Sequence, residues 1–243
     1  MAEKPLGSKA YGSIPHLPGS RLGPGDHHVS DGQARICTEK ARDRHDLILV
    51  TEKLDGGCCA VAKIDGQIIT LSRAGYLAAS SPYEMHHLFA EWVADCTTLF
   101  DALLREGERL VGEWLALAHG THYALRHDPF VVFDLMAGGE RSPYDQFLER
   151  VDGRLPVPHL LSRGGPFSIE STMALLADGG FHGALDPVEG AVWRVERRGQ
   201  VDFLAKYVRS DKIDGQYLPQ VSGGDPVWNW HPALLLEESA REL

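Results

Sequence analysis

The chain has 243 residues, of which 43% are hydrophobic, and it carries a formal net charge of −10. This hydrophobic content is sufficient for a folded core and excludes a disordered chain, while the negative charge argues against a protein that wraps long stretches of duplex nucleic acid. The sequence has no apolar run of about 18 residues and no apolar signal core near its N-terminus, so it predicts neither membrane insertion nor secretion. The expected location is therefore the cytoplasm.

The first part of the chain predicts an arm, a buried strand and a hairpin. Residues 4–32 are rich in Gly, Pro and Ser, which indicates an extended arm before the core, with a flexible leader as the alternative. The apolar run at 47–50 is typical of a buried strand. Two β-prone runs, 58–64 and 67–72, flank Asp65-Gly66, a pair that favours a tight hairpin turn.

The remaining elements predict an α+β fold. Apolar residues recur at helical spacing from 82 to 106, with Ser80 or Ser81 as N-cap and Gly107 as stop, which predicts one long amphipathic helix. Further strands are expected at 110–117, 130–135, 191–196 and 201–206, and shorter helices at 143–151, 169–176 and 232–243. We therefore expect largely antiparallel sheets with flanking helices.

The cysteines and histidines do not form a zinc pattern. The four cysteines, at 37, 58, 59 and 96, show no Cys-x-x-Cys spacing and are expected to be reduced. The adjacent histidine pairs at 27–28 and 86–87 have no third ligand at the spacing of a zinc site. His119 and His122 follow a predicted strand into a loop that could line a pocket, although loop histidines are mostly just exposed.

The pattern Lys-x-Asp-Gly occurs three times, beginning at Lys53, Lys63 and Lys212. Lys53 follows the predicted buried strand and precedes a turn, so its amine can lie at the mouth of a pocket. Desolvation and neighbouring cations would lower its pKa and make it a usable nucleophile. The copy at Lys63 falls on the predicted hairpin turn, and the copy at Lys212 lies in a polar, turn-rich stretch that predicts a surface loop. Lys53 is therefore the candidate nucleophile.

Around Lys53 the chain resembles the covalent nucleotidyltransferases, the superfamily of polynucleotide ligases and mRNA capping enzymes. The matched motifs, in order, are Lys53-Leu54-Asp55-Gly56, Ser72-Arg73, Gly112-Glu113-Trp114, Phe130-Val131-Val132-Phe133-Asp134, Glu189-Gly190 and Lys206. Within the superfamily, Gly112-Glu113-Trp114 with the later His119 and Tyr123 looks most like the RNA ligase branch. The chain departs from the family at Val208, where a second basic residue is usual, and Arg209 is the candidate substitute.

The resemblance implies a nucleotidyltransferase, or adenylation, domain over residues 33–212. An N-terminal arm would occupy 1–32 and a short C-terminal extension 213–243. The segment after Lys206 is too short for the C-terminal oligonucleotide-binding barrel of DNA ligases and capping enzymes, so no such barrel is expected in this chain.

The resemblance also implies a role for each matched residue. Lys53 would attack the α-phosphorus of ATP, forming a covalent lysyl-AMP and releasing pyrophosphate. The residues implied to hold the nucleotide are Glu52, Asp55, Arg73, Glu113, Phe133 and Lys206. Glu189, a carboxylate among apolar neighbours, is implied to bind Mg²⁺. ATP and Mg²⁺ are the expected cofactors.

Taken alone, several of these residues allow a simpler interpretation. Asp55 beside Gly56 is equally typical of a turn, and Phe133 could pack in the core. Arg73 could form a surface ion pair, Glu113 could be a solvated strand residue, and Lys206 could be partly buried with its amine in solvent.

The function implied is that of an ATP-dependent RNA ligase joining 5′-phosphate and 3′-hydroxyl ends through lysyl-AMP. Its expected partners are nucleic acid ends, RNA preferred over DNA, and a partner protein for end recognition. Two alternatives stay open. A DNA nick-sealing ligase shares every motif, and a non-sealing nucleotide-binding or nucleic-acid-binding module is favoured by the acidity and by Val208.

Overall fold

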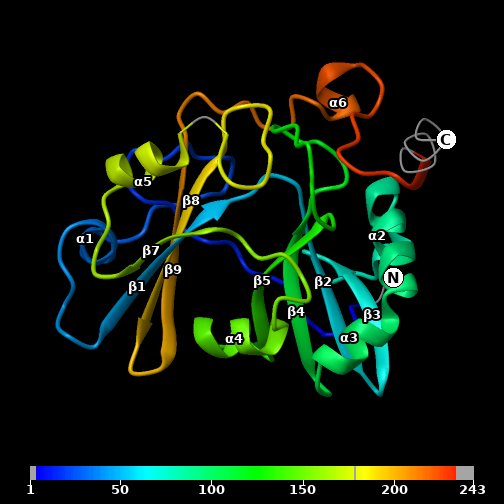
Figure 1. Ribbon diagram of the computed structural model, residues 1–243, viewed down its shortest axis with the longest axis horizontal. Coiled ribbons are helices and arrows are strands. Elements are labelled where there is room, and N and C mark those ends of the chain that lie inside the picture. Colours follow the sequence, from blue (N-terminus) through cyan, green and yellow to red (C-terminus); the bar gives the residue numbers. More distant parts are fainter. Residues whose placement is uncertain (1–3, 178, 234–243) are drawn as a thin grey trace.

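The computed structural model describes residues 4–177 and 179–233 and consists of two antiparallel sheets with flanking helices (Figure 1). In spatial order, the first sheet contains β7 (Leu160–Gly164), β1 (Asp46–Lys53), β8 (Gly190–Arg197) and β9 (Gln200–Val208). The second sheet contains β3 (Gln67–Ser72), β2 (Gly57–Ile64), β4 (Glu108–Trp114), β5 (Phe130–Ala137) and β6 (Glu140–Arg141). The expected α+β class with antiparallel sheets is confirmed.

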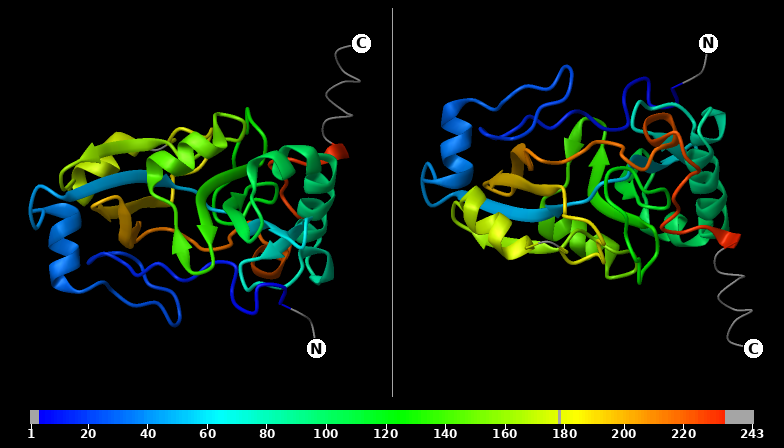
Figure 2. Two further views of the ribbon diagram at one scale, coloured as in Figure 1. Left: turned by 90° about the horizontal axis from the view of Figure 1, so that it is seen from below. Right: turned by 90° about the horizontal axis from the view of Figure 1, so that it is seen from above.

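The helices flank the two sheets, most of them on the outer sides, while the helix at 144–151 lies between the sheets (Figure 1 and Figure 2). They are α1 (Asp31–Thr38), the 3₁₀ turn η1 (Ala78–Ser80), α2 (Glu84–Asp95), α3 (Thr97–Leu103), α4 (Tyr144–Val151), α5 (Ile169–Leu176) and α6 (Pro219–Ser222). α1 and α5 pack on the first sheet around the buried Trp193, and α2 and α3 pack on the second around Phe89 and Phe130. Within the described ranges, no helix is long and apolar enough to cross a membrane.

The single long helix expected over 82–106 is wrong, because two helices stand in its place. α2 ends at Asp95, Cys96 leaves the helical region, and α3 begins at Thr97. The Thr97 hydroxyl donates to the carbonyls of Val93 and Ala94, at 3.2 and 2.8 Å, and such back-bonding bends helices. Apolar periodicity continues through the bend because both helices bury the same side, which is why the sequence pattern conceals the break.

The remaining local predictions agree with the structure to differing degrees. The hairpin is confirmed: Asp65 and Gly66, both with positive φ, join β2 to β3. Strand β4 is shorter than expected, since it ends at Trp114 instead of continuing to 117. All four cysteines carry free thiols. The helix expected over 232–243 lies, from residue 234 onward, outside the described residues.

The N-terminal arm lies along the edge of the first sheet beside β9. The Lys206 N–H donates to Pro15 O at 2.9 Å, and the Leu17 N–H donates back to Lys206 O at 2.7 Å. The Arg21 N–H donates to Val208 O at 3.0 Å. Leu17 is fully buried, so this part of the arm is a packed edge segment and the flexible-leader alternative is wrong for it.

The chain crosses from the first sheet to the second within a few residues of Lys53. β1 ends at Lys53 and β2 begins at Gly57, so the turn between them is also the junction between the sheets. A Cβ at Gly56 would lie 2.5 Å from Trp114 O, which is closer than real Cβ atoms come to backbone. Only glycine fits at this position, and its lack of a side chain allows the turn after β1 to pack closely against the end of β4.

Gly190 is predicted to be a stability determinant of the first sheet. Its φ is +155°, and a Cβ there would collide with the backbone of Tyr207 on β9. Gly190→Ala should therefore lower the free energy of unfolding by roughly 1–3 kcal/mol, as overpacking does, measured by urea denaturation. Gly32→Ala in α1 is the control: the added Cβ would have no atom within 4 Å, so the substitution should be neutral or slightly stabilising. Equal stability of the two variants would contradict the packing argument.

Candidate active site

A cavity opens where the two sheets meet, and we call it the first cavity. Its walls come from both sheets, the arm and α4. Six of the residues implied by the family resemblance line it, namely Glu52, Lys53, Arg73, Glu113, Phe133 and Lys206. Lys53 and Lys206, which are 153 positions apart in the sequence, therefore share one cavity. Their proximity follows from the crossing of the chain between the sheets.

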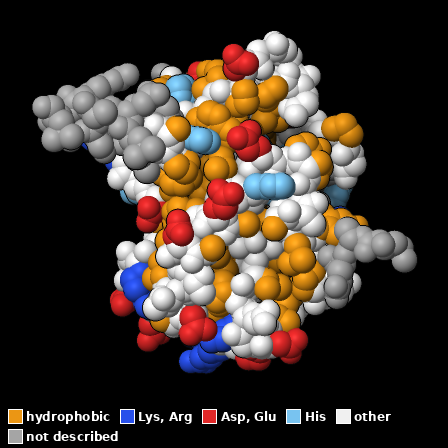
Figure 3. Space-filling view, turned by 90° about the vertical axis from the view of Figure 1, so that its right-hand side faces the viewer, with side chains coloured by type: hydrophobic (Ala, Val, Ile, Leu, Met, Phe, Trp, Pro, Cys, Tyr) orange, Lys and Arg blue, Asp and Glu red, His pale blue; other side chains and the backbone are white. Residues whose placement is uncertain are grey.

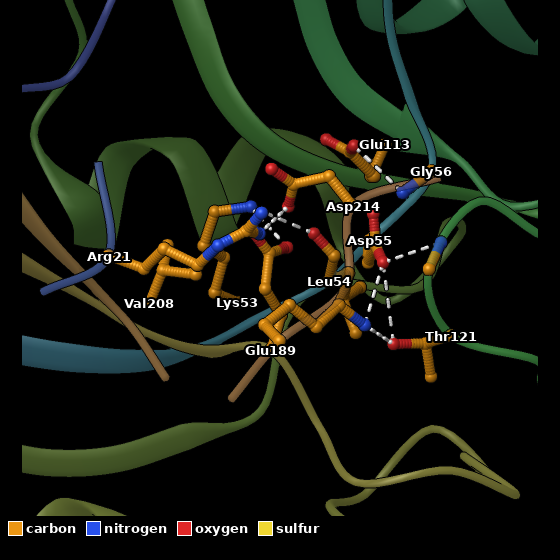
Figure 4. A network of polar contacts seen from close by, with 12 residues as sticks. Arg21, Lys53, Leu54, Asp55, Gly56, Glu113, Thr121, Glu189, Val208 and Asp214 are labelled. Atoms are coloured by element: carbon orange, nitrogen blue, oxygen red, sulfur yellow. Dashed lines mark hydrogen bonds and ion pairs between the residues drawn. The ribbon is translucent and has the colours of Figure 1, made fainter. Parts of the chain in front are cut away.

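Lys53 lies in a group of carboxylates. Its Nζ donates to Glu189 Oε2 at 2.5 Å and to Leu54 O at 3.3 Å (Figure 4). Burial lowers the pKa of Lys53, but attraction to Glu189, Glu113 and Asp55 outweighs burial and holds it above the ordinary value. The expectation of a depressed pKa is therefore wrong for the protein without ligand. The carboxylates that gather here are far away in the sequence, so their effect could not be read locally.

Glu113 and Glu189 approach Lys53 from different sheets. Glu113 accepts the Gly56 N–H at 3.1 Å, which ties β4 to the junction. The pKa of Glu113 is raised to about 7, chiefly by burial; attraction to Lys53 opposes this rise and repulsion from Glu189 adds to it. Burial likewise raises the pKa of Glu189, and its ion pair with Lys53 lowers it. Two carboxylates and one amine thus meet in a partly buried space where charge is costly unless it is paired.

Asp55 is held by the third copy of the Lys-x-Asp-Gly pattern. Its Oδ2 accepts the Gly120 N–H at 2.9 Å and pairs with Lys212 Nζ at 2.8 Å, and Lys212 also donates to the Thr121 hydroxyl. Lys212 is buried, so the surface loop expected at this copy is wrong. No local signal predicts this pair, because Asp55 and Lys212 lie far apart along the chain.

Lys206 combines burial with a nearby cation. Burial lowers its pKa, and the charge of Lys53 lowers it further. The backbone of Lys206 is hydrogen-bonded to the arm. Within the arm, the buried His16 forms hydrogen bonds through Nδ1 with Ser20 Oγ, at 2.7 Å, and through Nε2 with Asp26 Oδ2, at 3.0 Å. The arm thus fixes the position of Lys206 in the cavity. Val208, the departure from the family pattern, is buried, and its neighbour Arg209 pairs with Asp211.

Phe133 lines the first cavity, whereas Phe130 belongs to the core. Tyr11 from the arm meets the Phe133 ring edge-on, with centroids 5.2 Å apart, and donates to Asp134 Oδ2 at 2.6 Å. Asp134 also accepts from the buried Arg194 at 2.5 Å. Sequence reasoning missed Tyr11 and Arg194, since both act through contacts with residues more than 50 positions away. Together they fix the aromatic end of the cavity.

In the described part of the chain, the side chains of Glu52 and Arg73 form hydrogen bonds with residues other than Lys53. Successive side chains of a strand point to opposite faces, so the Glu52 carboxylate points away from the side chain of Lys53, and it accepts the Phe181 N–H at 3.0 Å. Burial raises the pKa of Glu52 to about 7. Arg73 directly follows β3, lines the cavity and donates to Ser13 Oγ at 3.0 Å. A nucleotide-binding role for either side chain stays a prediction.

The carboxylates at Lys53 fit the donor chemistry of a hard divalent cation. Mg²⁺ prefers oxygen ligands and is usually bound by one or two carboxylates together with substrate phosphates and water. Glu189 and Glu113 offer such oxygens beside the Lys53 amine, and Glu113 also lines the first cavity. Over residues 4–177 and 179–233, no three His, Cys, Asp or Glu side chains gather into a closed metal site.

The family model named RNA ligase matches residues 46–208. The chain belongs to the RNA ligase family. The match includes every motif residue from Lys53 to Lys206 and stops before Lys212. A search of curated proteins finds no match.

Solved RNA ligase structures share the fold at low sequence identity. A mutant of the Naegleria gruberi RNA ligase with AMP and Mn has a TM-score of 0.51 and 16% identity, over 80% of this chain and 59% of that chain. A second mutant of that ligase, with ATP and Mn, has a TM-score of 0.50 and 16% identity, over 80% of this chain and 58% of that chain. A structure of an archaeal ATP-dependent RNA ligase also matches, with a lower TM-score of 0.47 and 18% identity, over 81% of this chain and 49% of that chain; the shared fold is shown by the two former structures. The chain spans about half the length of these structures.

The Asp55–Lys212 pair should matter for stability. Lys212→Met leaves the Asp55 carboxylate without its cation and should cost about 3–5 kcal/mol, the usual effect of breaking a buried pair. Lys63→Met is the matched control, because Lys63 pairs with the exposed Asp101 and should change stability by less than about 1 kcal/mol. Adding Asp55→Asn to Lys212→Met should recover part of the loss in urea denaturation. Equal effects at Lys63 and Lys212 would show that the pair is not buried.

Proposed function

We propose that this member of the RNA ligase family is an ATP-dependent RNA ligase. Lys53 takes AMP from ATP, transfers it to a 5′-phosphate end, and a 3′-hydroxyl end then displaces AMP to seal the strand. The nucleic acid ends are the substrates, and RNA is preferred. The bounds of the domain and the cytoplasmic location stay predictions.

The observation that supports this proposal best is the position of the Lys53 amine. It lies at the junction of two sheets, in a cavity shared with Arg73, Phe133 and Lys206. A nucleotide needs an apolar or aromatic surface for its base and cations for its phosphates. Phe133 offers an aromatic surface for the base, and Arg73 and Lys206 offer cations for the phosphates. Lys53 is then placed among the groups that would bind the phosphates it attacks.

The chain's own residues account for each requirement of the first step. Attack needs a neutral Lys53 amine, whereas the unliganded site holds it charged through Glu189 at 2.5 Å. Lys206 brings positive charge to the same cavity, which favours both the phosphates and loss of the Lys53 proton. The turn at Gly56 keeps Lys53 at the end of its strand.

A divalent cation would be held by Glu189 and Glu113, next to Lys53. When bound, such an ion would neutralise the phosphates and compete with Lys53 for the carboxylate of Glu189, which favours the neutral amine. This requirement explains why a buried carboxylate is placed beside a nucleophilic lysine.

Adenylylation should depend on Glu189 and Lys206 without a matching loss of fold. With ATP and Mg²⁺, the unaltered protein should gain the mass of AMP, measured by intact mass spectrometry. Glu189→Ala and Lys206→Ala should form the adduct at least about a hundredfold more slowly, since each removes charge that acts in the transition state.

Two residues of the second sheet that lie outside the first cavity provide matched controls for this experiment. Glu140→Ala and Lys63→Ala remove the same side-chain types away from the cavity and should keep the normal rate. Circular dichroism and urea denaturation monitor folding. No adduct in the unaltered protein with either ATP or GTP would refute the proposed function, and loss of fold in both site variants would favour a structural role.

The strand preference can be tested with nicked duplexes that differ only in their 3′-hydroxyl strand. The 2′-hydroxyl of an RNA end adds a donor and an acceptor that the site can use. Sealing should therefore be faster when the last positions of that strand are ribonucleotides than when they are deoxyribonucleotides. Equal or faster sealing of the all-DNA nick would place DNA nick sealing ahead of RNA ligation.

A further inference from the structure

A second cavity continues from the first on the other side of Lys53. The two cavities share Lys53, Cys58, Arg73 and Glu113. The second is bounded by the turn after Lys53, the first turn of α2 and the C-terminal segment from 218 to 228. We call it the outer groove. Nothing in the proposed binding of ATP through Phe133 and Lys206 uses its far wall.

The chemistry of ligation requires a second substrate at Lys53. After the first step the nucleotide occupies the first cavity and its phosphorus is attached to Lys53. A 5′-phosphate must then reach this phosphorus from a direction that the nucleotide does not fill. The outer groove opens onto Lys53 from such a direction, because it shares Lys53 and Glu113 but not Phe133 or Lys206.

The rim of the outer groove carries exposed aromatic side chains. Tyr83, just before α2, is 55% exposed, and Tyr76, after β3, is 38% exposed. The ring of Tyr76 has Lys4 Nζ over it at 4.6 Å, which leaves Tyr83 the better stacking surface. Stacking on aromatic side chains is the usual way for proteins to hold unpaired bases. The face of the molecule that includes α2 shows hydrophobic and histidine side chains mixed at its upper end, with Lys and Arg gathered lower down (Figure 3).

His119 provides an independent sign of a ligand in the outer groove. It lines the groove close to Gly57, and its Nε2 is buried without a hydrogen-bond partner in the described part of the chain. A buried polar atom without a partner is costly unless a ligand or water satisfies it. Burial lowers the pKa of His119, so the ring is neutral near pH 7 and offers both a donor and an acceptor.

We propose that the outer groove binds the terminal nucleotides of the 5′-phosphorylated RNA strand, with a base stacked on Tyr83 and a sugar hydroxyl bonded to His119. This inference rests on the proposed function and adds the place and the contacts of the second substrate. Binding depends on stacking more than on phosphate contacts, in agreement with a chain of net charge −10.

The step served by this groove is transfer of AMP from Lys53 to the RNA. An oxygen of the 5′-phosphate attacks the phosphorus of lysyl-AMP, and the bond between phosphorus and Nζ breaks. The electron pair of that bond returns to Nζ, which takes up a proton from solvent. The product is RNA whose 5′-phosphate is joined to AMP through a phosphoanhydride, and no oxidant or further reactant is needed.

The test separates the second step from the first. The protein is first loaded with AMP and freed of ATP, and a 5′-phosphorylated RNA oligonucleotide is then added at increasing concentration in single-turnover experiments. Tyr83→Ala should load with AMP at the normal rate but require about tenfold more RNA for half-maximal transfer. Tyr83→Phe keeps the ring and should behave as the unaltered protein, whereas Tyr83→Leu should resemble Tyr83→Ala.

Phe181→Ala is the matched control, because Phe181 is 50% exposed and lines neither cavity. Normal half-saturation by RNA in Tyr83→Ala would overturn the inference while leaving the proposed function intact. Slower AMP loading in Tyr83→Ala would also overturn it, since the groove would then hold the phosphates of ATP. Failure of the unaltered protein to load AMP would instead refute the proposed function, and the inference with it.

Discussion

The ion pair between Lys53 and Glu189, 2.5 Å apart, depends on the crossing of the chain between two sheets. β1 ends in one sheet and β2 begins in the other within four residues, which places Lys53 where walls from both sheets converge. Glu189 comes from the start of β8 and Glu113 from β4, so the site exists only when both sheets are assembled. The packing of Gly56 against Trp114 and of the arm against β9 serves to hold this junction in place.

The electrostatics of the junction give the unliganded protein a resting state. Three carboxylates hold the Lys53 amine charged, while Lys206 and Lys212 balance part of their charge. A charged amine is a poor nucleophile, so under the proposed function the Lys53 amine would react only when phosphates and a cation rearrange these pairs. The groups that stabilise the unliganded site would then become ligands of the substrate and its cation. On this account, reactivity is coupled to binding.

Much of the fold and of the candidate site could be predicted from local sequence. Apolar alternation, the Asp65-Gly66 turn and the ordered motifs from Lys53 to Lys206 are local signals. They identified most of the strands and six of the residues that line the first cavity. The sequence could not show the bend at Cys96, where hydroxyl back-bonding breaks a helix without interrupting its apolar side. Nor could it show Lys212 against Asp55, or Tyr11 and Arg194 on Asp134, because these are pairings between distant segments. The pKa of Lys53 was predicted in the wrong direction for the same reason.

The central claim is that one lysine of three with the same local pattern carries the nucleotide. It can be tested most directly on the unaltered protein, by incubation with ATP and Mg²⁺ followed by proteolysis and fragment mass spectrometry at alkaline pH. The account predicts that the mass of AMP is found on Lys53 and that Lys63 and Lys212 are unmodified. AMP attached to Lys63 or Lys212, or to a residue outside the first cavity, would contradict it.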